Sequence, residues 1–360
     1  MLEVAARWRE HVDVGVLAPP QAAAMLRSFL GDVRIYELGS AGKRQAEQGP
    51  LLALEYMRRL AIATLRKLPV ADVVVAASHF SADAAGLAAM ARRGALGVSY
   101  VYHLVAGRRS FRPRTIWSKA DERVGLALLR RFSSVVFVSN RPTAAALAER
   151  GFAPAHTAVG IDVGSFHPAA PAALPPKAAF IARMVHTKGV MDAIEAWAQV
   201  RDRVPAATLR MVGAGPERER AAALAEELGI SESVEWCGFI PEEAKREILS
   251  GSRVLLAPSH EEGWGISVCE AMASAVPVVA YRLPVLDELF GSAYLGAPRG
   301  DVAGLADLAV QVLTDDSMAA AASRRGRDTA ERYDVSRVAD EELDLILRRW
   351  KLRRPDTCGS

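Results

Sequence analysis

Short runs of apolar and β-branched residues alternate along the chain with longer segments whose apolar residues recur at helical spacing. In the first half, the runs that predict strands are VDVGVLA, VRIYEL, ADVVVAAS, VSYVYHLV, SSVVFVS and HTAVGI. In the second half they are AAFIARM, ATLRMVGAG, VEWCGF, RVLLAPS, VPVVAY and AYLGAP. Strands that alternate with helices are typical of βαβ units on a parallel sheet. The pattern therefore predicts an α/β protein with doubly wound sheets.

The alternation is interrupted by the proline-rich stretch FHPAAPAALPPK, residues 166–177. Neither a helix nor a central strand tolerates prolines at this density, so the stretch predicts a linker. A chain of 360 residues also exceeds the length at which a single core stops growing. We therefore expect two Rossmann-like domains that face a central cleft, at residues 1–168 and 169–334. A helical tail follows, and its residues 335–354 can pack on the first domain.

Composition fits a protein with two cores, because 51% of the residues are hydrophobic. The three cysteines, Cys237, Cys269 and Cys358, have neither zinc-ligand spacing nor a CxxC pair, which fits a reducing compartment. The first residues lack a basic start followed by an apolar run, and no stretch approaches a membrane span. We expect a cytoplasmic protein, at most attached to the inner face of a membrane.

Charge is distributed unevenly between the two halves. Residues 1–168 carry 22 Lys and Arg against 13 Asp and Glu, a net charge of +9, and the remaining residues carry 23 against 29, a net charge of −6. A basic half indicates an anionic partner, such as a phosphorylated or lipid-linked substrate or a membrane surface. Arginines solvated on ordinary helices explain the excess equally well.

Two cations follow the first strand of the second half. Arg183 lies at the end of AAFIARM, and Lys188 lies in the loop that enters the next helix. Ligands of open α/β sheets bind outside the carboxyl ends of the strands. An arginine and a lysine beside a helix N-terminus are suited to a diphosphate. As two surface cations alone they would carry little meaning.

The next strand is followed by the glycines of GAGPERE, which begins at Gly213. This is neither a GxGxxG dinucleotide fingerprint nor a P-loop. The glycines can let the backbone approach a ligand, and a plain turn before a helix explains them nearly as well.

The stretch HEEGWGISVCEAMASAVPVVA, residues 260–280, follows a third strand. Gly263 and Gly265 free the backbone, and the amides of residues 264–268 point outward at a helix N-terminus. Glu262 lies just before the turn and Glu270 about one helical turn inside the helix, so a ligand with paired hydroxyls could reach both. The alternative is a carboxylate that complements the helix dipole and another that is merely solvated.

The segments ARMVHTKG, VGAGPE, VEWCGFIP, LLAPSHEEGWGISVCEAMASAVPVVA and, in the first half, YVYHLV occur in the order found in one family. With them, nearly the whole chain resembles the retaining glycosyltransferases of family 4, whose two-Rossmann-domain fold is called GT-B. The longest segment is highly specific, and the others are weaker singly.

The resemblance implies roles for individual residues. Arg183 and Lys188 would hold the donor diphosphate, Glu262 would bind hydroxyls of the donor sugar, and Glu270 would bind the ribose hydroxyls. The remaining implied site residues are Gly263, Trp264, Gly265, Ile266 and Ser267 at sugar and phosphate, Phe239, Ile240 and Gly213 at the base, and His103 at the acceptor side of the sugar. Without the resemblance, His103 would be interpreted as a structural histidine, and His79 even more so.

The implied reaction transfers a hexose-type sugar from a nucleoside diphosphate sugar to an acceptor hydroxyl, with retention at the anomeric carbon. It implies no metal and no other cofactor, because cations and a helix dipole serve the diphosphate. The acceptor would be a saccharide, a lipid-linked molecule or a small molecule in glycan, glycolipid or cell-surface polysaccharide biosynthesis. Nucleic acid is not an expected partner.

The chain departs from the family at its start. Family members begin with a strand and a glycine-rich loop, whereas MLEVAARWREHVDVGVL resembles the end of the first helix and the second strand. We expect the first strand and its loop to be missing and the first domain to be less stable for it. The alternative function is then a catalytically impaired nucleotide-sugar-binding protein or partner subunit. A third candidate is a GT-B sugar-nucleotide epimerase.

Overall fold

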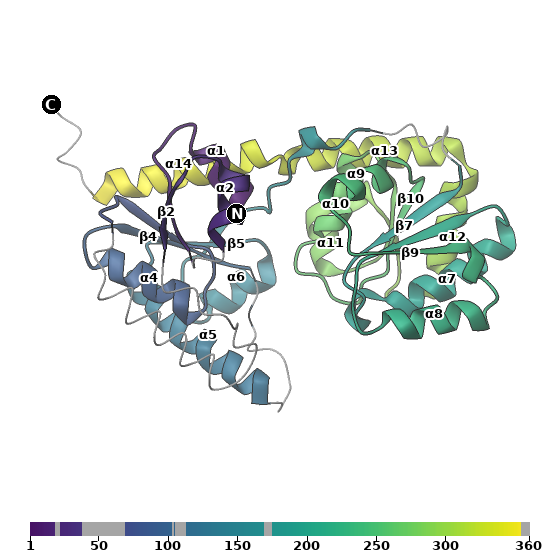
Figure 1. Ribbon diagram of the computed structural model, residues 1–360, viewed down its shortest axis with the longest axis horizontal. Coiled ribbons are helices and arrows are strands. Elements are labelled where there is room, and N and C mark those ends of the chain that lie inside the picture. The colour runs from purple at the N-terminus through teal and green to yellow at the C-terminus, as the bar shows by residue number, and fades with distance from the viewer. Residues whose placement is uncertain (19–21, 38–68, 103, 105–112, 169–174, 354–360) are drawn as a thin grey trace. The chain divides into compact units, whose positions relative to one another are not determined.

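The computed structural model describes residues 1–18, 22–37, 69–102, 104, 113–168 and 175–353. The chain divides into two compact units (Figure 1). Unit 1 comprises residues 1–160 together with 335–360, and unit 2 comprises residues 161–334. The C-terminal residues therefore return to the first unit.

The division falls after Gly160, ahead of the predicted boundary at residue 168. The Ile161 amide donates to the Tyr333 carbonyl oxygen at 2.9 Å, and the Val163 amide donates to the Asp334 carboxylate at 3.3 Å. Phe166 is buried and its ring lies under the guanidinium of Arg246. The start of the proline-rich stretch thus packs within unit 2 and does not mark the division.

The described residues of unit 1 form two parallel sheets. β1 pairs with β2, and the second sheet has the order β3-β4-β5-β6. The strands are β1 (Gly15–Ala18), β2 (Arg34–Glu37), β3 (Val73–Ala76), β4 (Leu96–Val101), β5 (Val135–Val138) and β6 (Ala155–His156). The helices are α1 (Leu2–Trp8), α2 (Ala23–Leu30), α4 (Ser81–Ala91), α5 (Pro113–Phe132), α6 (Arg141–Ala148) and α14 (Val335–Arg353).

Helices cover the four-stranded sheet on both faces, so every residue of β4 and β5 is buried, as is usual for central parallel strands. Leu87 of α4 and Leu129 of α5 pack against one face. Ile346 of α14 packs with Phe137 on the other face, and the Trp8 indole N–H donates to the Ala339 carbonyl oxygen at 2.9 Å. The end of the chain therefore contributes to the core of unit 1.

Glu342 of α14 is a buried carboxyl group in that core, and it accepts from the Tyr100 hydroxyl at 2.5 Å. Burial raises its pKa above the usual value, although the hydroxyls of Thr157 and Tyr100 oppose the shift. A carboxyl whose pKa is raised on folding contributes stability below its unfolded pKa, and that contribution is lost as the pH rises through the folded pKa. We therefore expect Glu342→Gln to gain stability relative to the natural chain as the pH rises from 4 to 8 in urea unfolding. A constant difference over this range would contradict the assignment.

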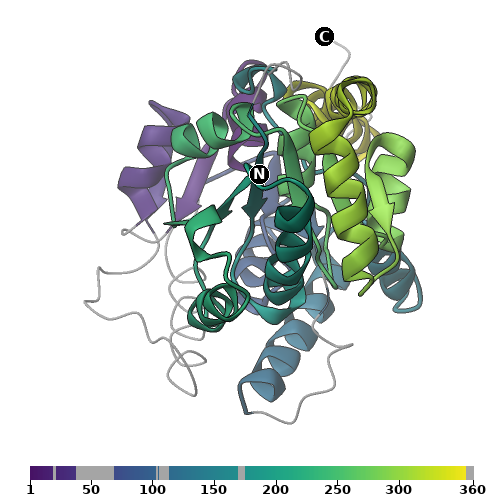
Figure 2. The same cartoon turned by 90° about the vertical axis from the view of Figure 1, so that its right-hand side faces the viewer.

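Unit 2 contains one parallel sheet of six strands in the order β12-β11-β10-β7-β8-β9. The strands are β7 (Lys177–Ile181), β8 (Thr208–Val212), β9 (Val234–Gly238), β10 (Val254–Ala257), β11 (Val278–Tyr281) and β12 (Leu295–Ala297). The α-helices are α7 (Val190–Arg203), α8 (Arg218–Glu227), α9 (Glu242–Ser250), α10 (Ile266–Ala273), α11 (Pro284–Phe290), α12 (Val302–Thr314) and α13 (Asp316–Ala330). Helices lie on both faces of this sheet (Figures 1 and 2).

The helices of unit 2 pack on the sheet through a buried apolar core. Trp197 of α7, Ala221 of α8 and Leu305 of α12 pack with Phe180 of β7 in one buried cluster.

No helix in the described part of the chain is long and apolar enough to cross a membrane.

The strand order of unit 2 reverses beside β7. From β7 the chain continues to β8 and β9 on one side, and it then returns to place β10, β11 and β12 on the other. Where successive crossovers diverge in this way, the loops after the two adjacent strands leave a crevice at the sheet edge. The loops after β7 and β10 therefore define the position at which unit 2 is expected to bind a ligand.

Candidate functional site

The loops after β7 and β10 bring a cation and a carboxylate into contact at this position. Lys188, the last residue of the 3-10 helix η4 (His186–Lys188), donates from Nζ to Glu262 Oε1 at 2.5 Å. The two side chains are only 18% and 11% exposed, and Ser259 Oγ donates to the same Oε1 at 2.9 Å. Two residues that the sequence assigned to the diphosphate and the sugar thus meet in one ion pair.

Arg183 lies on the same loop as Lys188, and its side chain is exposed. Among the described residues, the structure shows no hydrogen bond or ion pair for its guanidinium group. An exposed guanidinium without a protein partner can bind an anion bidentately without first breaking an internal contact.

Two glycines allow these loops to pack backbone against backbone. Gly189 has φ +66°, and a Cβ built on it would lie 1.9 Å from the Pro258 carbonyl oxygen. Gly213 has φ +129°, and its Cβ would lie 1.9 Å from the Ala182 carbonyl oxygen. The close approach at Gly213 is therefore to the loop that carries Arg183. The sequence had suggested approach to a ligand or a plain turn.

The loop after β10 leads into the N-terminus of α10. The amides of the first turn, from Ile266 to Val268, have no acceptor within the helix. A Cβ on Gly263 would meet nothing within 4 Å, so this part of the backbone faces open space. Trp264 is only 4% exposed and packs edge-on against Phe290 and Tyr333. Its side chain anchors the loop, and its backbone is the part near the helix start.

Glu270 lies on the inner side of α10, where its side chain is 10% exposed. Lys245 of α9 donates to Glu270 Oε1 at 2.7 Å and also pairs with Glu242 at 2.6 Å. Burial alone would lower the pKa of Lys245, but Glu270 and Glu242 raise it overall. No role was predicted for Lys245 from the sequence. The available signal was a lysine four residues before the buried Leu249, on the apolar face of α9.

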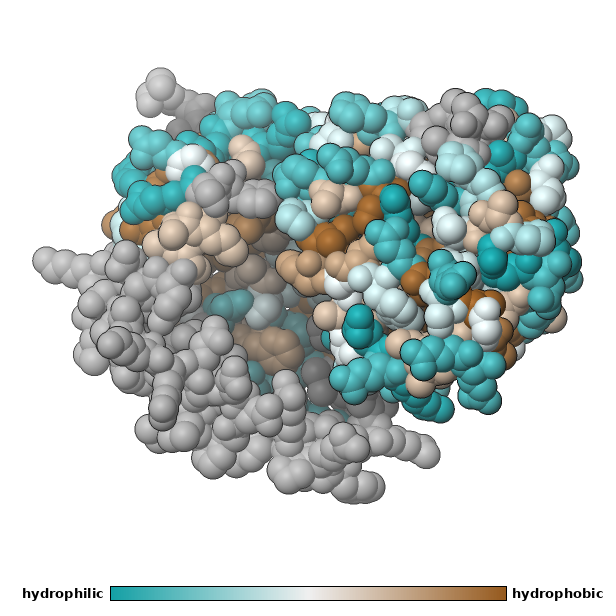
Figure 3. Space-filling view, turned by 45° about the vertical axis from the view of Figure 1, so that its right-hand side comes forward, coloured by the Kyte–Doolittle hydropathy of each residue, from teal (hydrophilic) through white to brown (hydrophobic). Residues whose placement is uncertain are grey.

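The loop after β9 carries the residues predicted to bind the base. Phe239 is 91% exposed, whereas Ile240 is partly buried. The Gly213 amide donates to the Gly238 carbonyl oxygen at 2.8 Å, which joins this loop to the one after β8. Over the coloured part of the surface in Figure 3, hydrophilic residues are interspersed with hydrophobic areas. A phenylalanine exposed to this degree is available for stacking.

Three further side chains, for which no role was predicted from the sequence, form a hydrogen-bonded network between the loop after β10 and α7. His260 Nε2 lies 3.2 Å from Asp192 Oδ2, and the Tyr281 hydroxyl donates to the same oxygen at 2.7 Å. Burial and the bond to Asp192 raise the pKa of Tyr281. The His260 amide also donates to the Thr187 carbonyl oxygen at 2.9 Å. These contacts hold the loop after β10 to the start of α7.

The predicted acceptor-side residue, His103, lies outside the described residues. His79, for which the sequence favoured a structural role, is buried with its Nε2 3.1 Å from Glu122 Oε1. In the described part of the chain, no group of three His, Cys, Asp or Glu residues could hold a metal ion.

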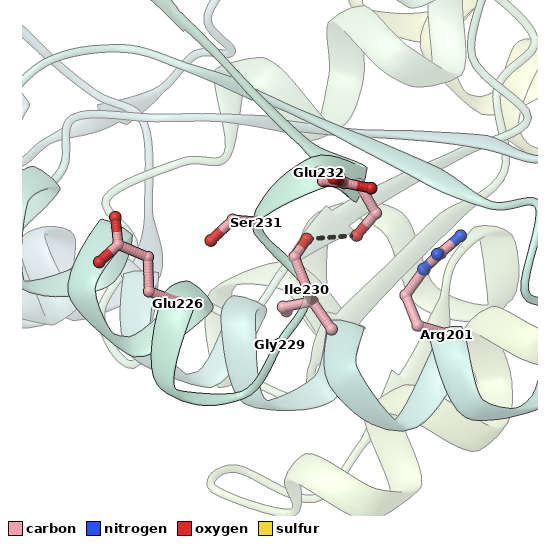
Figure 4. Close-up of a pocket in the computed structure, with 7 residues that line it drawn as sticks. Arg201, Glu226, Gly229, Ile230, Ser231 and Glu232 are labelled. Carbon is pink, nitrogen blue, oxygen red and sulfur yellow. Dashed lines mark hydrogen bonds between the residues drawn. The ribbon is translucent and has the colours of Figure 1, made fainter.

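Figure 4 shows a separate hollow of unit 2, lined by residues that include Arg201, Glu226 and Glu232. Its walls come from the ends of α7 and α8 and from residues just before β9, and Ser233 Oγ donates to the Ile230 carbonyl oxygen at 2.7 Å. These residues lie at the amino ends of parallel strands, at the edge opposite to the Lys188 and Glu262 loops. The hollow is not part of the candidate site.

Known proteins that resemble this chain include several glycosyltransferases. Residues 169–329 match the family model "Glycosyl transferases group 1". The 2-deoxystreptamine N-acetyl-D-glucosaminyltransferase of Streptomyces fradiae is 34% identical over 171 residues, 44% of this chain and 40% of that protein. The putative colanic acid biosynthesis glycosyltransferase WcaL of Escherichia coli is 32% identical over 202 residues, 52% and 49% of the two chains. The chain thus spans less than half the length of these curated relatives.

A solved structure with the same fold covers nearly the whole chain. HepE of Anabaena, crystallised with UDP and glucose, has a TM-score of 0.72 and 19% sequence identity over 96% of this chain and 94% of its own. At this identity the likeness concerns the fold, which is GT-B, as the sequence predicted.

Proposed function

Because residues 169–329 match the family model of the group 1 glycosyl transferases, we propose that the protein transfers a hexose-type sugar from a nucleoside diphosphate sugar to an acceptor hydroxyl. The observation that carries the proposal is the bond between Lys188 and Glu262 where the strand order reverses, on loops that also carry the exposed Arg183. Cations, a carboxylate and helix amides thus come together on the loops that follow β7 and β10, as a sugar joined to a diphosphate requires.

In the proposed reaction, the bond between the anomeric carbon and the phosphate oxygen breaks, and the acceptor oxygen bonds to the same face of the sugar. The acceptor proton passes to the leaving phosphate, and the anomeric configuration is retained. Arg183 and Lys188 stabilise the negative charge that grows on the diphosphate, and the first-turn amides of α10 add fixed dipoles. This arrangement supplies the stabilisation without a metal ion.

Glu262 is proposed to bind hydroxyls of the donor sugar. Its Oε1 accepts from Lys188 and Ser259, and among the described residues none hydrogen-bonds its Oε2. Glu270 is proposed to accept from the ribose hydroxyls, and Phe239 with Ile240 to contact the base. His103 retains its proposed place at the acceptor side.

The relatives suggest which substrates to test first. The HepE structure contains UDP and glucose, so uridine diphosphate hexoses are the first donors to try. The names of the Streptomyces and Escherichia coli relatives indicate an aminocyclitol and a polysaccharide pathway. We propose a saccharide, lipid-linked or small-molecule hydroxyl as the acceptor, at the cytoplasmic side of a membrane where the acceptor is lipid-linked.

A thermal-shift screen of the intact chain against UDP, GDP and their common sugars tests the donor site. We expect one nucleoside diphosphate to raise the melting temperature, and its sugar to yield a labelled product with an acceptor in the presence of EDTA. Binding without any product would favour the nucleotide-sugar-binding protein, and an epimerised donor without acceptor would identify an epimerase. If none of the nucleotides bound, the donor-site assignment would fail.

A further inference from the structure

We infer that Lys245 is a positioning residue, which holds the Glu270 carboxylate in the orientation that accepts the ribose hydroxyls of the nucleotide. The inference rests on the proposed function and concerns a residue outside the loops that follow β7 and β10. Lys245 lies on α9, which begins directly after the predicted base loop, and Glu270 lies on α10.

The contact is short and shielded from solvent. Lys245 Nζ lies 2.7 Å from Glu270 Oε1, and the two side chains are 14% and 10% exposed. An ion pair in such a setting is screened far less than one on the surface. The ammonium group therefore restricts the orientation of the carboxylate more strongly than an exposed partner would.

The position of Lys245 on its helix indicates that the contact is specific. Leu249, one turn later on the same face, is fully buried, so the sequence places a lysine where an apolar residue would pack. Burying an ammonium group is costly unless carboxylates compensate for it. Here Glu270 and Glu242 do so, and they raise the pKa of Lys245 despite its burial. The lysine therefore remains charged at neutral pH.

The pair also connects two parts of the proposed nucleotide site. Because α9 continues from the loop at Phe239 and Ile240, a bond from α9 to Glu270 fixes the distance between the base loop and the ribose carboxylate. A carboxylate that is already oriented loses less freedom when it binds two vicinal hydroxyls. Lys245 thereby acts on the ribose through Glu270.

The test uses ligands that differ only in the ribose hydroxyls. Calorimetry on the intact chain would compare UDP with 2′,3′-dideoxy-UDP, or the corresponding pair for whichever nucleotide binds the natural protein. We expect Lys245→Met to weaken binding of the ribonucleotide roughly 10-fold, the low end of the cost of removing a residue that orients a metal-binding side chain. Affinity for the dideoxy nucleotide should change by less than about twofold, because it offers Glu270 no hydroxyl to bind.

Matched variants keep the result interpretable. Glu242→Gln removes the other, 64% exposed partner of Lys245, and it should leave both affinities nearly unchanged. Lys245→Gln removes the charge and keeps a hydrogen-bond donor on a shorter side chain. If Lys245→Met folds poorly, this variant replaces it and should show the same loss of ribose preference. In a Glu270→Gln background, Lys245→Met should cause no further loss.

Each other outcome overturns the inference. Equal weakening of both nucleotides by Lys245→Met would place Lys245 at the diphosphate or the base. Unchanged affinities would make the pair purely structural, as would a lower melting temperature alone. Failure of the natural protein to bind any nucleoside diphosphate would instead contradict the proposed function, which separates the two failures.

Discussion

Replacing Arg183 with alanine is expected to reduce the turnover number about 10²–10³-fold, the effect of removing one donor that stabilises developing charge. The guanidinium is exposed and has no described protein partner, so the substitution removes no internal contact. Turnover would be measured with a labelled donor at saturation, and the melting temperature should remain within a few degrees of the natural value.

Arg220→Ala is the matched control for Arg183→Ala. Arg220 lies on α8 with a side chain 73% exposed, and its ion pair with Glu217 spans 3.7 Å. The Glu217 side chain is only 20% exposed, but its contact with the solvated arginine exceeds hydrogen-bond length and contributes little to stability. We expect its turnover and melting temperature to equal those of the natural chain. Unchanged turnover in Arg183→Ala would remove this residue from the diphosphate site.

Gly189→Ala should be among the most destabilising single substitutions in unit 2. Its φ of +66° costs about 1–2 kcal/mol for a residue with a Cβ. The Cβ would also lie 1.9 Å from the Pro258 carbonyl oxygen, a backbone atom that cannot move without displacing the loop after β10. We expect a total loss above about 4 kcal/mol, in the range that marks a specific structural defect.

Gly229→Ala separates the two causes of that loss. Gly229 has a φ of +68°, almost the same conformation, but a Cβ there would meet nothing within 4 Å. Only the conformational cost of about 1–2 kcal/mol should remain. Urea unfolding followed by circular dichroism would compare the two variants. Equal losses would show that the loop after β7 does not press on the loop after β10.

The order of elements could be predicted because each strand is a short β-branched or apolar run between helical segments. This signal depends on the residues of the strand itself, and β4 and β5 lie where VSYVYHLV and SSVVFVS predicted them. The pairing of residues that are far apart in the sequence leaves no such local signal. The run HTAVGI, residues 156–161, was predicted as a strand, but His156 alone of this run pairs with β5, together with the preceding Ala155. The limits of the two units depend on contacts such as Ile161 with Tyr333, which no local pattern announces.

In the candidate site, too, local features could be predicted from the sequence and contacts between distant residues could not. Arg183, Lys188, Glu262 and Glu270 could be proposed from the sequence because a motif fixes their positions relative to strand ends. Their partners could not, because the bond between Lys188 and Glu262 joins residues 74 positions apart. Lys245 is hidden for a related reason, since a lysine on a helix is taken as solvated until the packing of that helix is known. The roles of these residues at the sugar, the ribose and the base stay predictions, which the binding measurements above test.

The close backbone contacts at Gly189 and Gly213 limit how the donor preference of the protein can be changed. Because Gly189 meets Pro258 and Gly213 meets Ala182 at the backbone, the loops after β7, β8 and β10 cannot change length or path independently of one another. Insertions or grafted loops at any of the three would propagate to the other two. New donor preferences should therefore be reached through side-chain substitutions, for example at Phe239 in the neighbouring loop after β9. Directed evolution of this site would then enrich point substitutions and reject insertions and deletions.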